Sequence, residues 1–309
     1  MIYTCTITPS IDYTVYLPEF HPGKLNRTEE VYFFPGGKGI NVSRVLNRLN
    51  VNSVALGFAG GFTGEYIQNF LHDEGIKTTF IATNEPTRIN VKIKAANESE
   101  LNGPGPNTTH EQREELLAKL EQLDTGDWFV LAGSLPDTIP NAFYQAIATT
   151  CHTKGIHFVL DTSGSALKQL IDTKAFLIKP NENELGELFD TKISTKKEAI
   201  FYAKKLVKQG IKHVIVSMGG NGAILVTEEQ VLLAEAPKGK VVNTVGAGDS
   251  LVSGFIAAYV QGNDVTEAFR YGIASGSATA FRTDLCDKTD VEALVSKVTL
   301  YPYKEEDVI

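Results

Sequence analysis

The sequence has few cysteines, no long apolar run and no excess of positive charge. The three cysteines, Cys5, Cys151 and Cys286, are widely spaced, and none belongs to a CxxC pair. A disulfide framework and a zinc site are therefore not expected, and a reducing compartment fits. No stretch reaches the roughly 18 apolar residues of a membrane span, and residues 1–10 lack the pattern of a signal peptide. We expect a soluble, cytoplasmic protein that does not bind membranes.

The charge balance limits the ligands of the protein. Lysine and arginine number 29 against 37 aspartate and glutamate residues, which gives a net charge of −8 over 309 residues. Without a basic surface, we expect no nucleic-acid partner. An anionic ligand must instead be held by a local cluster of cations or by a metal ion. The 42% of hydrophobic residues is ordinary for a folded chain, and this length can bury a large core.

Strand-like runs alternate with helical periodicity along most of the chain. Apolar residues recur at i, i+3, i+4 and i+7 in 42–49, and similar helical patterns follow in 67–71, 116–123, 143–151 and 200–207. Strand candidates are 2–7, 53–58, 127–132, 157–160, 175–178, 213–217 and 223–227. This order predicts an α/β fold with a mostly parallel central sheet and helices on both faces. Ligands of such sheets bind beyond the carboxyl ends of the strands.

Two segments break this alternation. Residues 12–34 read as extended chain with turns at Pro18 and Pro22, and residues 87–94 alternate between apolar and polar side chains as a strand does. We expect both in a small β-sheet that forms a lid, with 102–106 as the return hinge. The predicted main domain is then 1–11, 35–86 and 106–309, and the predicted lid is 12–34 and 87–105.

Residues 243–250, Asn-Thr-Val-Gly-Ala-Gly-Asp-Ser, precede an apolar helical segment. The backbone N–H groups of Gly246, Ala247 and Gly248 can surround an anion at the helix start, where the helix dipole adds to the attraction. Asp249 would then lie beside that anion and could take a proton from a nucleophilic hydroxyl. The alternative is an ordinary helix start with Asp249 in its first turn.

A second glycine-rich segment, 36–41, also leads into a helix. Its spacing fits neither GxxxxGK[ST] nor GxGxxG. Gly37 could still present a backbone donor, and Lys38 and Asn41 would face the same pocket. The alternative is a flexible turn with a solvated lysine.

Residues 179–184, Lys-Pro-Asn-Glu-Asn-Glu, follow a buried strand. Asn181 and Glu184 are three apart at a helix start, so both can face the carboxyl end of that strand. Amide and carboxylate oxygens suit Mg²⁺, bound directly or through its waters. Asn181 as N-cap with Glu184 at N3 is the alternative, and both interpretations can hold together.

Two further segments suit the wall of a nucleotide pocket. The first lies between two strands and offers Ser217, Gly219, Gly220 and Gly222; it also reads as a plain hairpin. The second, 274–280, is helical and rich in small residues, which leaves room for an adenine ring near Ser275. Close helix packing is the alternative.

The segments 36–43 with 57–64, 179–184 and 244–249 occur together in an order and spacing that resemble the ribokinase-like, phosphofructokinase-B carbohydrate kinases. The likeness covers essentially the whole chain. Within the family the chain is most similar to the bacterial 1-phosphofructokinases, with tagatose-6-phosphate kinases close behind. The latter tend to have Pro and Ser where this chain has Thr244 and Ala247.

The resemblance implies ATP and Mg²⁺ as cofactors and phosphoryl transfer to a sugar hydroxyl. By position it implies that Asp249 is the base, that residues 246–248 form an anion hole, and that Asn181 and Glu184 govern Mg²⁺ and phosphate. The remaining implied positions contact the sugar: Asp12, Gly37, Lys38 and Asn41. Many relatives have Asp where this chain has Asn243, so we do not expect the potassium activation of ribokinases.

The residues themselves favour an acceptor that is already phosphorylated. Arg88 and Lys92 share one face of the predicted lid strand, with Asn90 between them, and Lys38 is placed to face them. Such a cation cluster in an acidic protein can grip a phosphate, although a charged exposed strand is the alternative. We expect fructose 1-phosphate and ATP to give fructose 1,6-bisphosphate and ADP, in a homodimer formed through the lid. The alternatives are a tagatose-6-phosphate kinase and a non-catalytic sugar-phosphate-binding protein.

Overall fold

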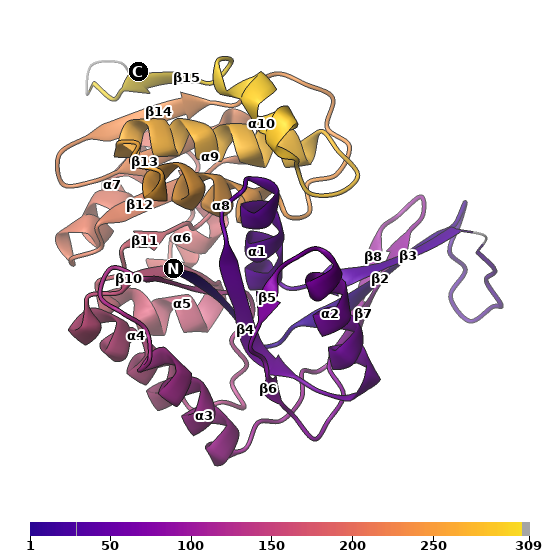
Figure 1. Ribbon diagram of the computed structural model, residues 1–309. Helices are drawn as coiled ribbons and strands as arrows, with labels where there is room; N and C mark the ends of the chain where they lie inside the picture. The colour runs from indigo at the N-terminus through magenta and orange to yellow at the C-terminus, as the bar shows by residue number, and fades with distance from the viewer. Residues whose placement is uncertain (29, 305–309) are drawn as a thin grey trace.

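The structure is a computed structural model that describes residues 1–28 and 30–304. A large sheet runs through the main body in the order β15-β14-β13-β12-β11-β10-β9-β1-β4-β5, and β6 also pairs with β4 (Figure 1). Pairing is parallel from β5 through β12 and antiparallel from β12 to β15. The strands are β1 (Ile2–Thr6), β4 (Ser53–Ala59), β5 (Lys77–Thr78), β6 (Ile81–Ala82), β9 (Trp128–Ala132), β10 (His157–Asp161), β11 (Leu177–Ile178), β12 (His213–Ser217), β13 (Ala223–Val226), β14 (Val231–Glu235) and β15 (Thr299–Pro302).

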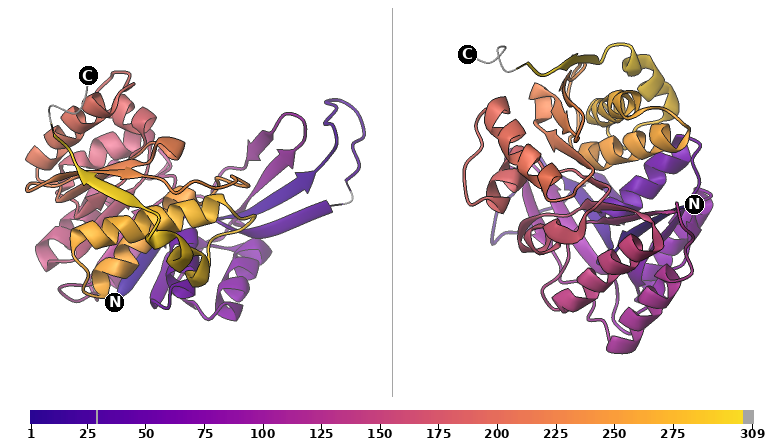
Figure 2. Two further views of the ribbon diagram at one scale, coloured as in Figure 1. Left: turned by 90° about the horizontal axis from the view of Figure 1, so that it is seen from above. Right: turned by 90° about the vertical axis from the view of Figure 1, so that its left-hand side faces the viewer.

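Helices cover both faces of this sheet, which confirms the predicted α/β class (Figure 2). One apolar core packs α3 to α7 against one face, and a second packs α1, α8, α9 and α10 against the other. The helices are α1 (Lys38–Arg48), α2 (Gly61–Asp73), α3 (His110–Leu120), α4 (Asn141–Lys154), α5 (Gly164–Leu170), α6 (Glu182–Leu188), α7 (Lys196–Lys208), α8 (Ala247–Val260), α9 (Val265–Ala280) and α10 (Lys288–Val295), with 3-10 turns at Ile171–Thr173 and Gly219–Asn221. Within residues 1–28 and 30–304, no helix combines the length and the apolar character needed to cross a membrane.

A second, four-stranded sheet projects from the main body (Figures 1 and 2). We call it the small sheet. Its order is β3-β2-β7-β8, and the strands are β2 (Ser10–Tyr16), β3 (Glu30–Gly36), β7 (Arg88–Lys94) and β8 (Ser99–Asn102). The small sheet contains strands from both segments that interrupt the helix–strand alternation of the sequence, 12–34 and 87–94. Its strands β2 and β7 pair in parallel. The small sheet carries exposed apolar side chains, among them Tyr32, Phe33 and Phe34.

The carboxyl ends of the central strands gather the polar segments of the sequence. Strand β1 leads into β2, β10 ends at Asp161, and β11 is followed by Lys179. Helices α1, α6 and α8 begin at this same edge, so their first backbone N–H groups and first-turn side chains point toward it. Sequence segments far apart in the chain therefore meet in one place.

Candidate active site

A cavity of about 910 Å³ lies at the carboxyl edge of the main sheet, between that edge and the small sheet. It brings together all but two of the residues that the sequence singled out. Its lining includes Asp12, Gly37, Lys38, Asn41, Arg88, Asn90, Lys179, Asn181, Glu184, Ser217, Gly219, Gly220, Gly222, Gly246, Ala247, Gly248 and Asp249. Lys92 and Ser275 have other surroundings, described below.

Residues 243–248, which we call the anion loop, contain a left-handed residue directly before α8 begins. Gly246 has a φ of 80° and is the N-cap of α8, so Ala247 and Gly248 are its first two helical residues. The backbone angle favours glycine, and a Cβ on Gly246 would lie 2.5 Å from Cδ2 of Leu285, so that side chain would have to move. A Cβ on Gly248 would lie 3.1 Å from Nζ of Lys179. The loop thus presents the bare start of a long helix to the cavity, beside a lysine ammonium group.

Asp249 lies in the first turn of α8 and is 6% exposed. Its Oδ2 accepts a hydrogen bond of 2.8 Å from Nδ2 of Asn41, in the first turn of α1. This bond joins two motifs that are 208 residues apart in the sequence. Burial and the nearby charge of Asp161 raise the pKa of Asp249 to about 6, although Lys38, Asn41 and Lys179 oppose the shift. A carboxylate poised near neutral pH, beside an anion site, is well suited to act as a general base.

Lys38, Lys179 and the buried Asp161 lie between α1 and the anion loop. We call these three residues the cavity floor. Nζ of Lys38 donates to Oδ1 of Asp161 at 3.0 Å, and Nζ of Lys179 lies 3.6 Å from the same oxygen. Burial alone would raise the pKa of Asp161, but Lys179 and Lys38 outweigh it and lower that pKa. Burial would lower the pKa of Lys38, but Asp161 and then Asp249 raise it. Asp161 and Lys38 are therefore both charged at neutral pH.

Asp12 is held on the side of the cavity formed by the small sheet. Its Oδ1 accepts hydrogen bonds from Ser10 Oγ at 2.8 Å and Asn90 Nδ2 at 3.2 Å. Its Oδ2 forms an ion pair with Nζ of Lys92 at 2.8 Å. Lys92 thus neutralises Asp12 and does not line the cavity with Arg88.

Arg88 is a half-buried cation on the same wall. Burial lowers its pKa from the ordinary value, and Asp12 opposes that change. Within the described chain, Nε of Arg88 has no hydrogen-bond partner, and Nη1 makes only a 3.5 Å contact with the carbonyl oxygen of Gly103. A guanidinium group in this state is ready to bind an anion that enters the cavity.

Asn181 and Glu184 form the capping box that the sequence allowed. Asn181 Oδ1 accepts from Glu184 N at 2.8 Å, and Glu184 Oε2 accepts from Asn181 N at 2.9 Å. Both residues also line the cavity, so the cap does not exclude a second role. Across residues 1–28 and 30–304 there is no cluster of three or more His, Cys, Asp and Glu side chains that could hold a metal by itself. The residues fit Mg²⁺ that is bound mainly by its waters and by a phosphorylated ligand.

The glycine-rich turn after β12 forms another wall of the cavity. Ser217 pairs with Asn181 in an isolated bridge, which brings the turn next to the metal-compatible residues. A Cβ on Gly222, whose φ is 90°, would lie 1.9 Å from the carbonyl oxygen of Ala234. Ser275 turns the other way: its hydroxyl donates to the carbonyl of Tyr271, and it packs against Gly254 of α8. The close-packing interpretation of 274–280 holds at Ser275, while Gly276, Ser277 and Ala280 of the same helix line the cavity.

Asp161 is the main site residue that the sequence did not reveal. Its position carried a signal, because it directly follows the apolar strand residues 157–160, as Lys179 follows its own strand. Asp161 lies beneath Lys38 and Lys179 and does not itself line the cavity, whereas Ser10, Ser134 and Phe281 line it without having been marked by a sequence motif.

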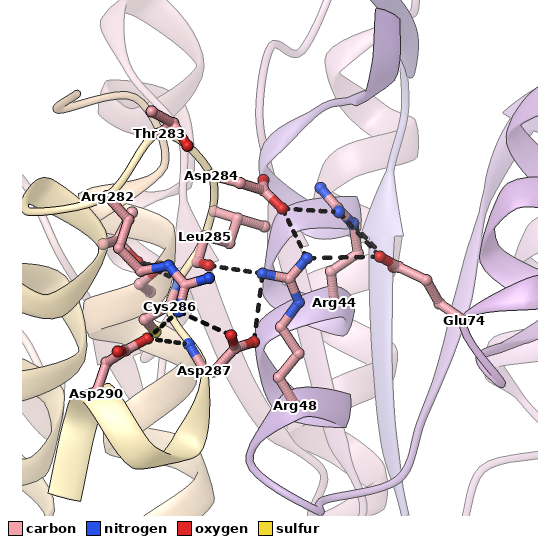
Figure 3. A network of polar contacts seen from close by, with 12 residues as sticks. Arg44, Arg48, Glu74, Arg282, Thr283, Asp284, Leu285, Cys286, Asp287 and Asp290 are labelled. Atoms are coloured by element: carbon pink, nitrogen blue, oxygen red, sulfur yellow. Dashed lines mark hydrogen bonds and ion pairs between the residues drawn. The ribbon is translucent and has the colours of Figure 1, made fainter. Parts of the chain in front are cut away.

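A network of arginines and carboxylates joins α1 to residues 282–290 (Figure 3). Arg44 and Arg48 of α1 both bond Oδ2 of Asp284, at 3.3 and 2.7 Å, and Arg48 Nη1 donates to the carbonyl of Leu285. Arg44 also makes two 2.9 Å hydrogen bonds to Glu74, which follows α2. Leu285 packs on Gly246 of the anion loop. The network therefore connects α1 to the segment on which the anion loop rests.

The comparisons with known proteins agree on one family. The family model for pfkB carbohydrate kinases matches residues 5–291. A 1-phosphofructokinase of Bacillus subtilis (strain 168) is 50% identical over 298 residues, which cover 96% of this chain and 98% of that protein. A D-tagatose-1-phosphate kinase of Bacillus licheniformis is 36% identical over 301 residues, or 97% and 99% of the two chains.

Solved structures of a related protein have the same fold. Phosphofructokinase-2 from Escherichia coli in complex with substrates and products is similar with a TM-score of 0.91, at 29% identity over 96% of this chain and 98% of that chain. A tetrameric inhibited form of that protein is similar with a TM-score of 0.90. The likeness thus extends over nearly the full length in both sequence and structure.

Proposed function

Because the chain belongs to the pfkB family of carbohydrate kinases, we propose that it transfers the γ-phosphoryl group of ATP to fructose 1-phosphate, which gives fructose 1,6-bisphosphate and ADP. The observation that carries the proposal is the position of Asp249, which is buried next to the bare N-terminus of α8 and bonded to Asn41. The similarity to a 1-phosphofructokinase at 50% identity supports the choice of acceptor. A half-buried Arg88 in the same cavity supports an acceptor with a phosphate group.

In this reaction Asp249 takes the proton of the attacking sugar hydroxyl. The hydroxyl oxygen forms a bond to the γ-phosphorus, and the bond from that phosphorus to the bridging oxygen of ADP breaks. The N–H groups of residues 246–248 and the ammonium groups of Lys38 and Lys179 offset the negative charge of the moving group. Mg²⁺, held through its waters by Asn181 and Glu184 and directly by the ATP phosphates, would supply further positive charge.

We also propose that the small sheet is the lid of the site, with residues 12–34 and 87–105 as its span. Asp12, Asn90 and Arg88 reach the cavity from β2 and β7, so movement of the small sheet would open and close the acceptor side. Exclusion of water before transfer protects the γ-phosphoryl group from hydrolysis.

A second copy of the chain would cover the exposed apolar residues of the small sheet in a homodimer or larger assembly. These residues are Tyr16, Val31, Tyr32, Phe33, Phe34, Ile89 and Leu101. Sedimentation velocity at micromolar concentration tests this: Tyr32→Asp should dissociate the assembly, and Phe201→Asp on α7 should not. A wild-type monomer would contradict the assembly but not the lid. A cytoplasmic location, with its reducing conditions, suits the three buried free thiols.

The activity is tested by ATP consumption with a panel of acceptors: fructose 1-phosphate, fructose 6-phosphate, tagatose 1-phosphate, tagatose 6-phosphate, ribose and adenosine. The highest kcat/KM is expected with fructose 1-phosphate. Tagatose 1-phosphate is the second candidate, because the 36% identical relative is named as a kinase of that sugar phosphate. Activity with free ribose or adenosine alone would contradict a phosphorylated acceptor.

A further inference from the structure

Asp161 is the most deeply buried charged group of the cavity floor. Its side chain is fully buried at the carboxyl end of β10, whereas the side chain of Lys38 is 33% exposed and that of Lys179 is 6% exposed. Both ammonium groups approach the same oxygen, Oδ1. Oδ2 is buried and accepts no hydrogen bond from the described part of the chain.

This arrangement is unusual for a carboxylate that serves only to stabilise the fold. Such a group generally uses both oxygens, because an unpaired buried oxygen is costly. Lys168 and Asp190 show the ordinary alternative on the surface, where Nζ bonds both carboxylate oxygens at 3.1 and 3.0 Å and both side chains are more than half exposed. Exposed pairs of this kind contribute little to stability.

The lysines lie where the transferring group must pass. Lys179 is next to Gly248 of the anion loop, and Lys38 is the first residue of α1, whose Asn41 holds the base. Two ammonium groups brought this close repel each other and lose solvation, so without a carboxylate beneath them they would turn away toward water.

We infer that Asp161 is a positioning residue, whose carboxylate holds Lys38 and Lys179 aimed at the path of the transferring phosphoryl group before any substrate binds. The inference rests on the proposed kinase function for its consequence, but the arrangement itself can be measured without turnover. When the phosphates enter, the two lysines are in place and need no reorganisation, which is the condition under which electrostatic stabilisation of a transition state is largest.

Asp161→Asn is the principal variant, since it keeps the shape and removes the charge. Loss of a negative charge near an anion site does not weaken anion binding, so KM for ATP should not rise. Misplaced lysines should lower kcat by about ten- to a hundredfold. A fall in kcat without a rise in KM therefore separates positioning from simple electrostatics. Asp190→Asn, which removes a carboxylate bonded to Lys168 far from the floor, is the matched control and should leave both constants unchanged.

The pH profile gives a readout that a merely structural role would not move. The charged groups facing Asp249 are Asp161, Lys38 and Lys179, and Asp161 is the one that raises its pKa by charge. The acid limb of kcat/KM should therefore move to lower pH in Asp161→Asn. Asp190→Asn should keep the wild-type limb.

A third measurement does not depend on activity, and its first comparison uses the wild type alone. Trace acetylation with acetic anhydride, followed by mass spectrometry, reports the fraction of each lysine that is neutral. In the wild type, Lys38 should react more slowly than Lys168, because Asp161 and Asp249 raise its pKa. In Asp161→Asn, Lys38 should react faster than in the wild type.

The outcomes distinguish this inference from the proposed function. Wild-type protein without sugar-phosphate kinase activity would refute the proposed function. The acetylation rates would still test whether Asp161 holds Lys38 in place. A kcat within about threefold of wild type in Asp161→Asn, with an unmoved acid limb, would overturn the inference. If Asp161→Asn does not fold, the wild type alone can overturn the inference. It would do so if Lys38 were acetylated as fast as Lys168 or faster.

Discussion

The two ends of strand β10 carry ionisable residues in opposite electrostatic settings. Asp161, the last residue, is buried and charged because two lysines face it. His157, the first residue, and His213, the first residue of β12, lie in an aromatic cluster with Trp128 and Phe176, with ring centroids 4.6 to 4.8 Å apart. Within the described chain, neither ring nitrogen of buried His213 has a hydrogen-bond partner.

The difference shows that buried ionisable groups at the two edges of one sheet are kept in opposite charge states. At the carboxyl edge, buried charges are kept ionised by counter-charges, so they are available for chemistry. At the amino edge, burial keeps His213 neutral: desolvation, followed by repulsion from Lys212, lowers its pKa to about 4, although Glu229 opposes the shift. We therefore expect acid to lower the catalytic rate through the groups at the carboxyl edge. At the amino edge, acid should instead lower the stability of the fold through His213.

The largest expected effect is at the carboxyl edge. Asp249→Asn keeps an oxygen that can accept from Asn41 but removes the proposed base. Loss of a general base should lower kcat by ~10²–10⁴-fold, with KM for both substrates roughly kept. Steady-state kinetics measure this, and circular dichroism checks that the variant is folded. A kcat within a few-fold of wild type would mean that another group takes the proton.

The next largest effect is at the amino edge. Folded protein takes up the His213 proton only near pH 4, whereas unfolded chain takes it up near pH 6.5, so the unfolded state binds more protons between these values. Stability should thus fall as the pH falls from about 6.5 to 4, by roughly 3 kcal/mol for this group. His213→Phe should flatten that dependence in urea unfolding curves. The control is His72→Ala, which removes an exposed histidine side chain of α2 and should keep the wild-type slope.

Arg88 tests the acceptor side of the carboxyl edge. Arg88→Ala removes a charge-assisted contact of about 1.5–3 kcal/mol, so kcat/KM for fructose 1-phosphate should fall by about one to two orders of magnitude. KM for ATP should change little. Lys94→Ala is the matched control, since Lys94 shares the strand but pairs with Glu98. Equal effects of the two variants would show that only the overall charge of β7 matters.

The smallest expected effect separates a helix cap from a metal site. Glu184→Gln retains a cap acceptor but loses the negative charge, so the Mg²⁺ concentration for half-maximal rate should rise severalfold. Glu198→Gln makes the same change in the capping box of α7, away from the cavity. Both variants should lose similar amounts of thermal stability, and only the first should need more Mg²⁺. Identical Mg²⁺ titrations would leave Glu184 as a cap alone.

The sequence predicted the parts of the molecule that depend on local pattern. The central parallel strands and the helices α1, α2, α3, α4 and α7 follow from periodicity, and the glycine motifs predicted where residues such as Gly246 would lie. The strands β5, β6, β14 and β15 were missed; β5 and β6 have two residues each, and a run this short carries little pattern.

Pairings between distant side chains could not be predicted. Lys92 bonds Asp12 because β2 and β7 are in parallel register, and Lys38 bonds Asp161 across 123 residues. Ser275 packs on α8 because two helices approach closely there. Each of these contacts depends on tertiary structure, which no local spacing encodes.

The network that joins α1 to residues 282–290 has a consequence for synthesis of the chain on the ribosome. Arg48 meets Asp284 across 236 residues (Figure 3), and Asn41 meets Asp249 across 208. Helix α1 emerges early, yet its partners are made near the end of translation. A nascent chain that stops before Asp284 holds Arg44, Arg48 and Glu74 but lacks Asp284 and the carbonyl of Leu285, which Arg48 bonds. Such contacts between distant parts of a chain also slow folding. Until the last part of the chain is made, α1 therefore lacks the contacts that join it to the segment packed against Gly246.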